Sequence, residues 1–207
     1  MNTDLPTPVS GVTRSWSKMI TLFGLLALLA TGALAVLAGC GATAAGSRST
    51  TQHLTFDILP VKPGGPAQNF PTYIATSVTA LPANSLVTVT IRNFDLGDDS
   101  LPADSPFLNV QGTADGAAIM DGKSYKSLDA GHIAHTFTIP QLHLNVPISG
   151  DPVGDANNVT VTFSFRTPAK AGTYTFQCYV PCGTGSVGWD GPMATSGYMR
   201  GTLTVVA

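Results

Sequence analysis

The sequence contains no glutamate, so all twelve of its acidic side chains are aspartates. Charged residues make up only 11% of the 207 residues, and strong helix formers are scarce. Gly (22) and Pro (15) are abundant, as are Thr and Val. Because Thr and Val favour strands while Gly and Pro favour turns, this composition predicts short strands and tight connections rather than helices.

Positive charge is also scarce, with ten Lys and Arg against twelve acids and a formal net charge of -2. Such a chain lacks the basic surface that nucleic-acid binding requires. It also lacks a Gly-x-Ser-x-Gly motif, and its aspartates have no apolar setting that would separate their pKa values. The sequence therefore predicts that the protein neither binds nucleic acid nor acts as an enzyme.

The first of only three cysteines, Cys40, ends an apolar and uncharged run over residues 19–38. Arg14 and Lys18 precede that run. The ending Leu37-Ala-Gly-Cys40 resembles the lipobox of bacterial lipoproteins, which implies cleavage before Cys40 and a lipid attached to it. The alternative is an uncleaved transmembrane helix, since about 20 apolar residues can span a bilayer.

Both alternatives place the rest of the chain outside the membrane, because the positive charges precede the apolar run. We therefore expect a signal or anchor segment at 1–39, a flexible tether at 40–51 and one folded domain at 52–207. The expected location is the extracytoplasmic face of the cell membrane.

Alternation of apolar and polar residues predicts the strands of the folded domain. Val87, Val89 and Ile91 would face a core, while the residues between them face solvent. Similar patterns lie at 53–58, 132–139, 142–146, 159–165, 174–178 and 197–205, and Asp121-Gly122 predicts a hairpin turn. Such a chain predicts an all-β fold of two packed antiparallel sheets, a β-sandwich.

Four aspartates, Asp95, Asp98, Asp99 and Asp104, cluster among glycine and prolines after the strand at 86–91. Clustered carboxylates can bind Ca²⁺, but the spacing matches no calcium-loop motif. The cluster is therefore interpreted as a solvated acidic surface loop.

The remaining two cysteines lie in the run Cys178-Tyr-Val-Pro-Cys182-Gly-Thr-Gly185, and Met199 follows just before the last expected strand. Outside the cytoplasm, such a pair is either oxidised to a disulfide or protected by a metal. A disulfide requires the two Cα atoms to come within about 7 Å. The sequence leaves both possibilities open.

From residue 132 to residue 206 the chain resembles a cupredoxin, a Greek-key antiparallel β-sandwich. The resemblance lies in the histidine strand, the Gly-Thr-Tyr-Thr-Phe-Gln-Cys strand and the closing Met-Arg-Gly-Thr-Leu-Thr-Val. The cysteine loop is most similar to that of the CuA domain of cytochrome c oxidase subunit II. This resemblance implies copper as the cofactor and His135, Cys178, Cys182 and Met199 as its ligands.

The chain departs from that family at the second histidine ligand. In the CuA pattern the position of this histidine is occupied by Ser186, and in the blue-copper pattern it is occupied by Gly183. No histidine follows His143 in the sequence. His143 and His132 are candidate substitutes, although His132 would need a bulge to reach the site.

With one imidazole, two sulfurs and a thioether from Met199 or Met193, the donor set suits Cu(I), and also Zn²⁺. We therefore expect a membrane-tethered protein that binds copper and passes electrons or copper ions to a protein partner. The alternative is a metal-free binding or structural module in which Cys178 and Cys182 form a disulfide.

Overall fold

The computed structural model describes residues 51–64, 70–77, 80–182 and 191–207. The expected signal or anchor segment lies outside these residues, as does all of the expected tether except residue 51. Within the described ranges, no helix is both long and apolar enough to cross a membrane.

The described chain is built almost entirely from strands. Its elements are β1 (Gln52–Leu59), β2 (Thr72–Ala75), β3 (Ala80–Pro82), β4 (Leu86–Asn93), η1 (Pro106–Leu108), β5 (Ala118–Met120), β6 (Lys123–Tyr125), β7 (His135–Ile139), η2 (Pro140–Leu142), β8 (Leu144–Ile148), β9 (Val159–Arg166), β10 (Gly172–Gln177) and β11 (Arg200–Val206). The two η elements are single turns of 3-10 helix.

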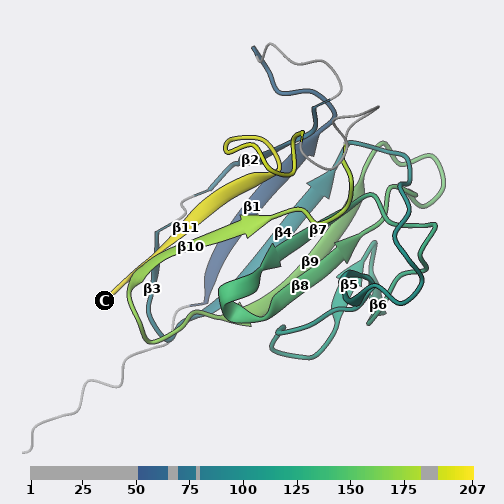
Figure 1. Cartoon of the computed structure of the whole chain (residues 1–207). Coiled ribbons are helices and arrows are strands. Elements are labelled where there is room, and N and C mark those ends of the chain that lie inside the picture. The colour runs from purple at the N-terminus through teal and green to yellow at the C-terminus, as the bar shows by residue number, and fades with distance from the viewer. Residues whose placement is uncertain (1–50, 65–69, 78–79, 183–190) are drawn as a thin grey trace, which may run out of the picture. The chain divides into compact units, whose positions relative to one another are not determined.

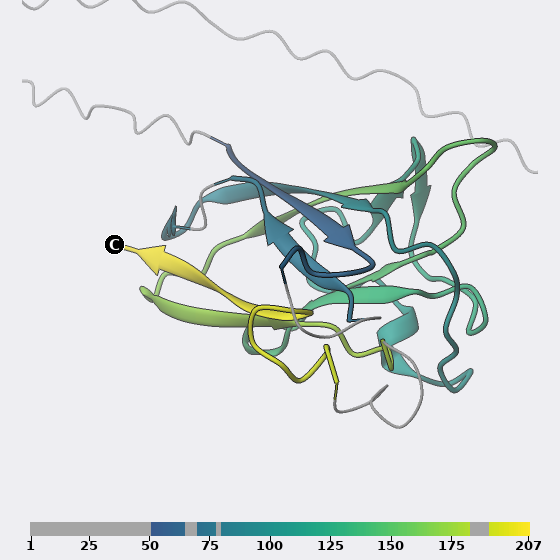
Figure 2. The same ribbon diagram turned by 90° about the horizontal axis from the view of Figure 1, so that it is seen from above.

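The strands form two sheets that pack face to face (Figures 1 and 2). One sheet has the order β2-β1-β4-β9-β5-β6, and the other has the order β3-β11-β10-β7-β8. Most neighbours are antiparallel, but β1 pairs with β4 and β11 pairs with β3 in parallel. The predicted all-β sandwich is confirmed.

Alternating burial explains why these strands form. In β4, Val87, Val89 and Ile91 are fully buried, while the residues between them are more exposed. Ile91 lies opposite Val161 of β9, which is also buried, so neighbouring strands present one continuous apolar face. Burial of such side chains contributes roughly 1.5–3 kcal/mol each and fixes the register.

The predicted turn at Asp121-Gly122 is present between β5 and β6. Both residues have positive φ, 46° at Asp121 and 81° at Gly122, as a two-residue hairpin of this kind requires. Strands β2 and β3 were not predicted, because segments of four and three residues carry too little alternation to be recognised.

An aromatic cluster joins the two sheets at the centre of the sandwich. The ring of Phe56, on β1, lies 5.4 Å from that of Phe137 on β7 and 5.3 Å from that of Phe176 on β10. Tyr73 packs edge-on against all three rings. Its hydroxyl donates a hydrogen bond of 3.0 Å to the Thr136 carbonyl, so the cluster also fixes the backbone of β7.

Three segments meet at one end of the sandwich. The chain that follows β4 pairs with the segment before β7, where the Asp99 N–H donates to the Ile133 carbonyl at 2.8 Å. The chain that follows β10 reaches the same region, because the Tyr179 N–H donates to the Thr136 hydroxyl at 2.8 Å. This end therefore brings together residues from three distant parts of the sequence.

Candidate metal centre

His135, Cys178 and Cys182 converge at this end of the sandwich. One ligand atom from each lies within 4.8 Å of the others. The residues are 2%, 0% and 1% exposed, respectively. Of the four metal ligands expected from the sequence, the structure thus brings three together in a site closed to bulk water.

Strands of the five-stranded sheet position His135 and Cys178. His135 is the first residue of β7 and lies opposite Ile148 of β8. Cys178 directly follows β10, and its N–H donates to the Met199 carbonyl at 2.9 Å. The imidazole and the first sulfur are therefore held by the hydrogen-bonded ladder of the sheet.

The two cysteines are free, with their sulfurs 2.8 Å apart. That separation exceeds the S–S bond length of about 2.05 Å. A tight turn brings them together, because the Cys182 N–H donates to the Val180 carbonyl at 2.6 Å. The Val180 N–H in turn lies 3.4 Å from the Cys178 sulfur. The disulfide remains a prediction for the oxidised chain.

The environment separates the acidities of the two thiols. Burial raises the pKa of Cys178, but the neighbouring Cys182 thiol and the His135 imidazole outweigh burial and hold this pKa well below its usual value. Burial and the neighbouring Cys178 together raise the pKa of Cys182 well above its usual value. The environment therefore favours the thiolate form of Cys178 and the thiol form of Cys182, and the thiolate is the form that binds metals.

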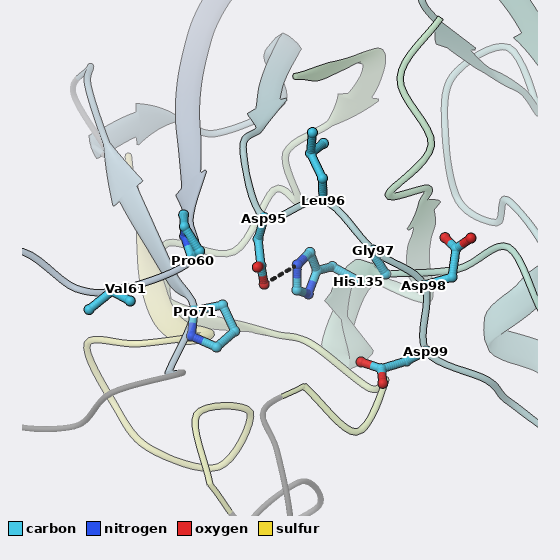
Figure 3. Close-up of a pocket in the computed structure, with 10 residues that line it drawn as sticks. Pro60, Val61, Pro71, Asp95, Leu96, Gly97, Asp98, Asp99 and His135 are labelled. Carbon is cyan, nitrogen blue, oxygen red and sulfur yellow. Dashed lines mark ion pairs between the residues drawn. The ribbon is translucent and has the colours of Figure 1, made fainter. Parts of the chain in front are cut away.

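His135 carries two buried ring nitrogens. Nε2 pairs with the Asp95 carboxylate at 3.1 Å (Figure 3), whereas Nδ1 has no hydrogen-bond partner among the described residues. Burial lowers the pKa of His135, but Asp95 and Cys178 outweigh burial and raise it to about 9. Because buried polar atoms almost always have partners, the unpartnered Nδ1 beside two sulfurs fits a bound metal ion.

The two methionines weighed as thioether ligands are both buried, Met199 at 0% and Met193 at 5% exposure. The Met199 N–H donates to the Pro192 carbonyl at 3.0 Å, which holds the segment before β11 close to the Cys178 backbone. The ligand role of Met199 remains a prediction.

Neither histidine that was weighed as a substitute ligand lies at this site. His143 follows η2 beyond the tip of the β7–β8 hairpin and is exposed. The four residue steps from His135 to Ile139 along β7 already span roughly 13 Å. His132 is also exposed, and its Nδ1 lies 2.9 Å from Asp151 and 3.6 Å from Asp98. The positions of the missing histidine, 183 and 186, lie outside the described residues.

Asp95 is the residue at this site that the sequence did not reveal. It belongs to the acidic cluster interpreted as a solvated loop, yet its carboxylate contacts a buried imidazole. The contact depends on how the segment after β4 packs against Ile133, and no local pattern in the sequence predicts that packing. A carboxylate on the second ring nitrogen is a common orienting partner of metal-binding histidines.

Among solved structures, the chain is similar to the copper protein rusticyanin. The sequence identity is 19%, and the alignment covers 75% of this chain and 78% of that chain with a TM-score of 0.34. A rusticyanin from Thiobacillus ferrooxidans gives 16% identity, 75% and 77% coverage and a TM-score of 0.32. A multicopper oxidase gives 10% identity, 74% and 43% coverage and a TM-score of 0.31.

No family model matches the chain, and no curated protein matches it. The structural similarities are too distant to assign residue roles, so the candidate centre rests on its own geometry.

The charge arrangement predicts a thiolate that depends on His135. In the reduced, metal-free chain at neutral pH, we expect the ultraviolet absorbance of one thiolate. His135→Gln removes the cation that lowers the pKa of Cys178, so the thiolate should titrate at a higher pH. His143→Gln is the matched control, because His143 is exposed and lies at the far end of the hairpin. Equal titration midpoints in the wild type and His135→Gln would contradict this arrangement.

Proposed function

We propose that the domain binds one copper ion through His135, Cys178 and Cys182, and that Met199 completes the ligand set. The observation that supports this proposal is the closeness of an unpartnered, buried imidazole nitrogen to two unbonded, buried sulfurs. Such a site is costly for an apoprotein, because buried polar groups without partners are destabilising by about 1–3 kcal/mol each.

The donor set favours copper over the alternatives. Thiolate, thioether and imidazole are soft or borderline ligands, which select Cu(I) and tolerate Cu(II). Zinc commonly takes four thiolate or imidazole ligands in structural sites, and the described residues provide three of these. When bound, copper would supply a one-electron couple between Cu(I) and Cu(II).

Electron transfer to a protein partner is the role that the ligand arrangement supports best. His135 begins a strand paired along its whole length, and Cys178 is fixed to the Met199 carbonyl, so the ligands are held without copper. Small rearrangement on gaining or losing an electron favours rapid transfer, whereas copper delivery would require these buried ligands to release the ion. We propose a carrier rather than an enzyme, because the sequence has no recognisable catalytic motif.

Copper titration of the reduced chain tests this proposal. We expect one copper per chain and a thiolate-to-copper absorption in the visible or near-ultraviolet spectrum. Cys178→Ser, Cys182→Ser and His135→Gln should each weaken binding by at least about a hundredfold, since disturbing even the partners of a ligand costs about 10–100-fold. Met199→Leu should alter the spectrum more than the affinity, and His143→Gln should change neither.

A different result would contradict the copper proposal. If the chain takes up no copper after mild reduction, and if thiol counting finds none free beforehand, the disulfide-bonded module becomes the better description.

The proposal also places the domain at the extracytoplasmic face of the cell membrane, attached through a lipid on Cys40. It is supported by the apolar run at 19–38 and the Leu-Ala-Gly-Cys ending. Mass spectrometry of the chain extracted from membranes should find a lipidated N-terminus at residue 40. Cys40→Ser should abolish the lipid and the cleavage. An intact Met1 would contradict lipidation and support the transmembrane anchor instead.

A further inference from the structure

A pocket of about 240 Å³ opens beside the candidate metal centre (Figure 3). The segment that follows β4 forms one wall, and the chain on either side of residues 65–69 forms another. The lining residues used below are Pro60, Pro71, Asp95, Asp98, Asp99 and His135. The pocket therefore lies between solvent and the buried imidazole.

The charge of this pocket is negative. Asp95, Asp98 and Asp99 line it, and among the described residues no lysine or arginine does. The ammonium of Lys62, next in sequence to the lining residue Val61, lies 4.6 Å from the centre of the Tyr198 ring. Burial raises the pKa of Asp99, His135 lowers it, and the negative neighbours Cys178, Asp95 and Asp98 raise it further. The three carboxylates thus give the walls a negative potential, which His135 in the pocket and His132, at 3.6 Å from Asp98, offset in part.

His135 connects this pocket to the sulfurs. It is the only one of the three converging ligands that lines the pocket, while Cys178 and Cys182 do not. Its buried Nε2 pairs with the Asp95 carboxylate at 3.1 Å on the pocket side, as Figure 3 shows. The imidazole therefore stands between the acidic pocket and the thiolate.

We propose that this pocket is a loading port through which metal cations reach the buried donors. Asp98 and Asp99 concentrate the cation at the mouth, and Asp95 brings it to His135. This inference rests on the proposed function, because a port has a purpose only if His135, Cys178 and Cys182 hold a metal. The ligand class is a hydrated, positively charged metal ion rather than an anionic complex.

If the port attracts cations, its charge should affect the rate at which a metal cation associates with the site. A cleft lined by charge of one sign raises the association rate of an opposite charge by about 10- to 1,000-fold. Salt screens this effect, since the Debye length falls from about 30 Å at 0.01 M to about 3 Å at 1 M ionic strength. Removal of the carboxylates should therefore slow loading at low salt and change the final complex little.

Stopped-flow loading of the reduced full chain with Co²⁺ tests the port. Co²⁺ is a hydrated cation that does not oxidise thiols, and its binding to thiolate is followed by charge-transfer absorption. The test variant combines Asp98→Asn with Asp99→Asn. Asp115→Asn is the matched control, because Asp115 is exposed and lines a different pocket beside Ser164 of β9.

At an ionic strength of about 0.01 M we expect the double variant to load about tenfold more slowly than the wild type. The final absorption should be equal, which shows that the site itself is intact. The Asp115→Asn control should load at the wild-type rate. A double variant with Asp98→Glu and Asp99→Glu keeps the charge and should load close to that rate. At about 1 M the differences should disappear.

Two results would overturn the inference, and they are distinguishable. Equal loading rates of the wild type and the double asparagine variant at low salt would remove the port and leave the metal centre standing. Absence of any thiolate-to-cobalt absorption in the reduced wild type would remove the metal centre, and the port with it.

Discussion

The candidate metal centre depends on one interaction, the close approach of an imidazole and two sulfurs that are not joined in a disulfide, all buried from water. Taken alone, each group is costly there: a thiolate loses its solvation, and a buried ring nitrogen lacks a partner. Together, His135 and Cys178 offset part of that cost through opposite charge. Asp95 and Cys178 raise the pKa of His135, and His135 and Cys182 lower the pKa of Cys178. A soft metal ion would satisfy all three donors at once.

The sandwich provides what this interaction requires. Its aromatic centre fixes β7 through the Tyr73 hydroxyl, and β10 delivers Cys178 beside it. The turn at Val180 then returns the second sulfur toward the first. None of these constraints involves the metal, so the donors are positioned by the fold itself, which suits a site that exchanges electrons rather than one that forms around its ion.

The sequence predicted the fold well because alternation is a local property. In β4 and β9 the alternation of apolar and polar residues directly predicts which side chains are buried. The pair Asp121-Gly122 likewise predicts the turn that it forms. The ligand set was predicted only by resemblance to a family, since His135 and Cys178 are 43 residues apart and their closeness depends on strand order. Asp95 was missed for the same reason, because its contact with His135 crosses from one sheet to the other.

X-ray absorption at the copper edge of the loaded, reduced chain tests the central claim most directly, because it reports the atoms bound to the ion. The account predicts a nearest shell that contains two sulfurs and one imidazole nitrogen, from Cys178, Cys182 and His135. A shell made only of oxygen and nitrogen, in a chain whose Cys178 and Cys182 thiols are shown to be free, would contradict this prediction.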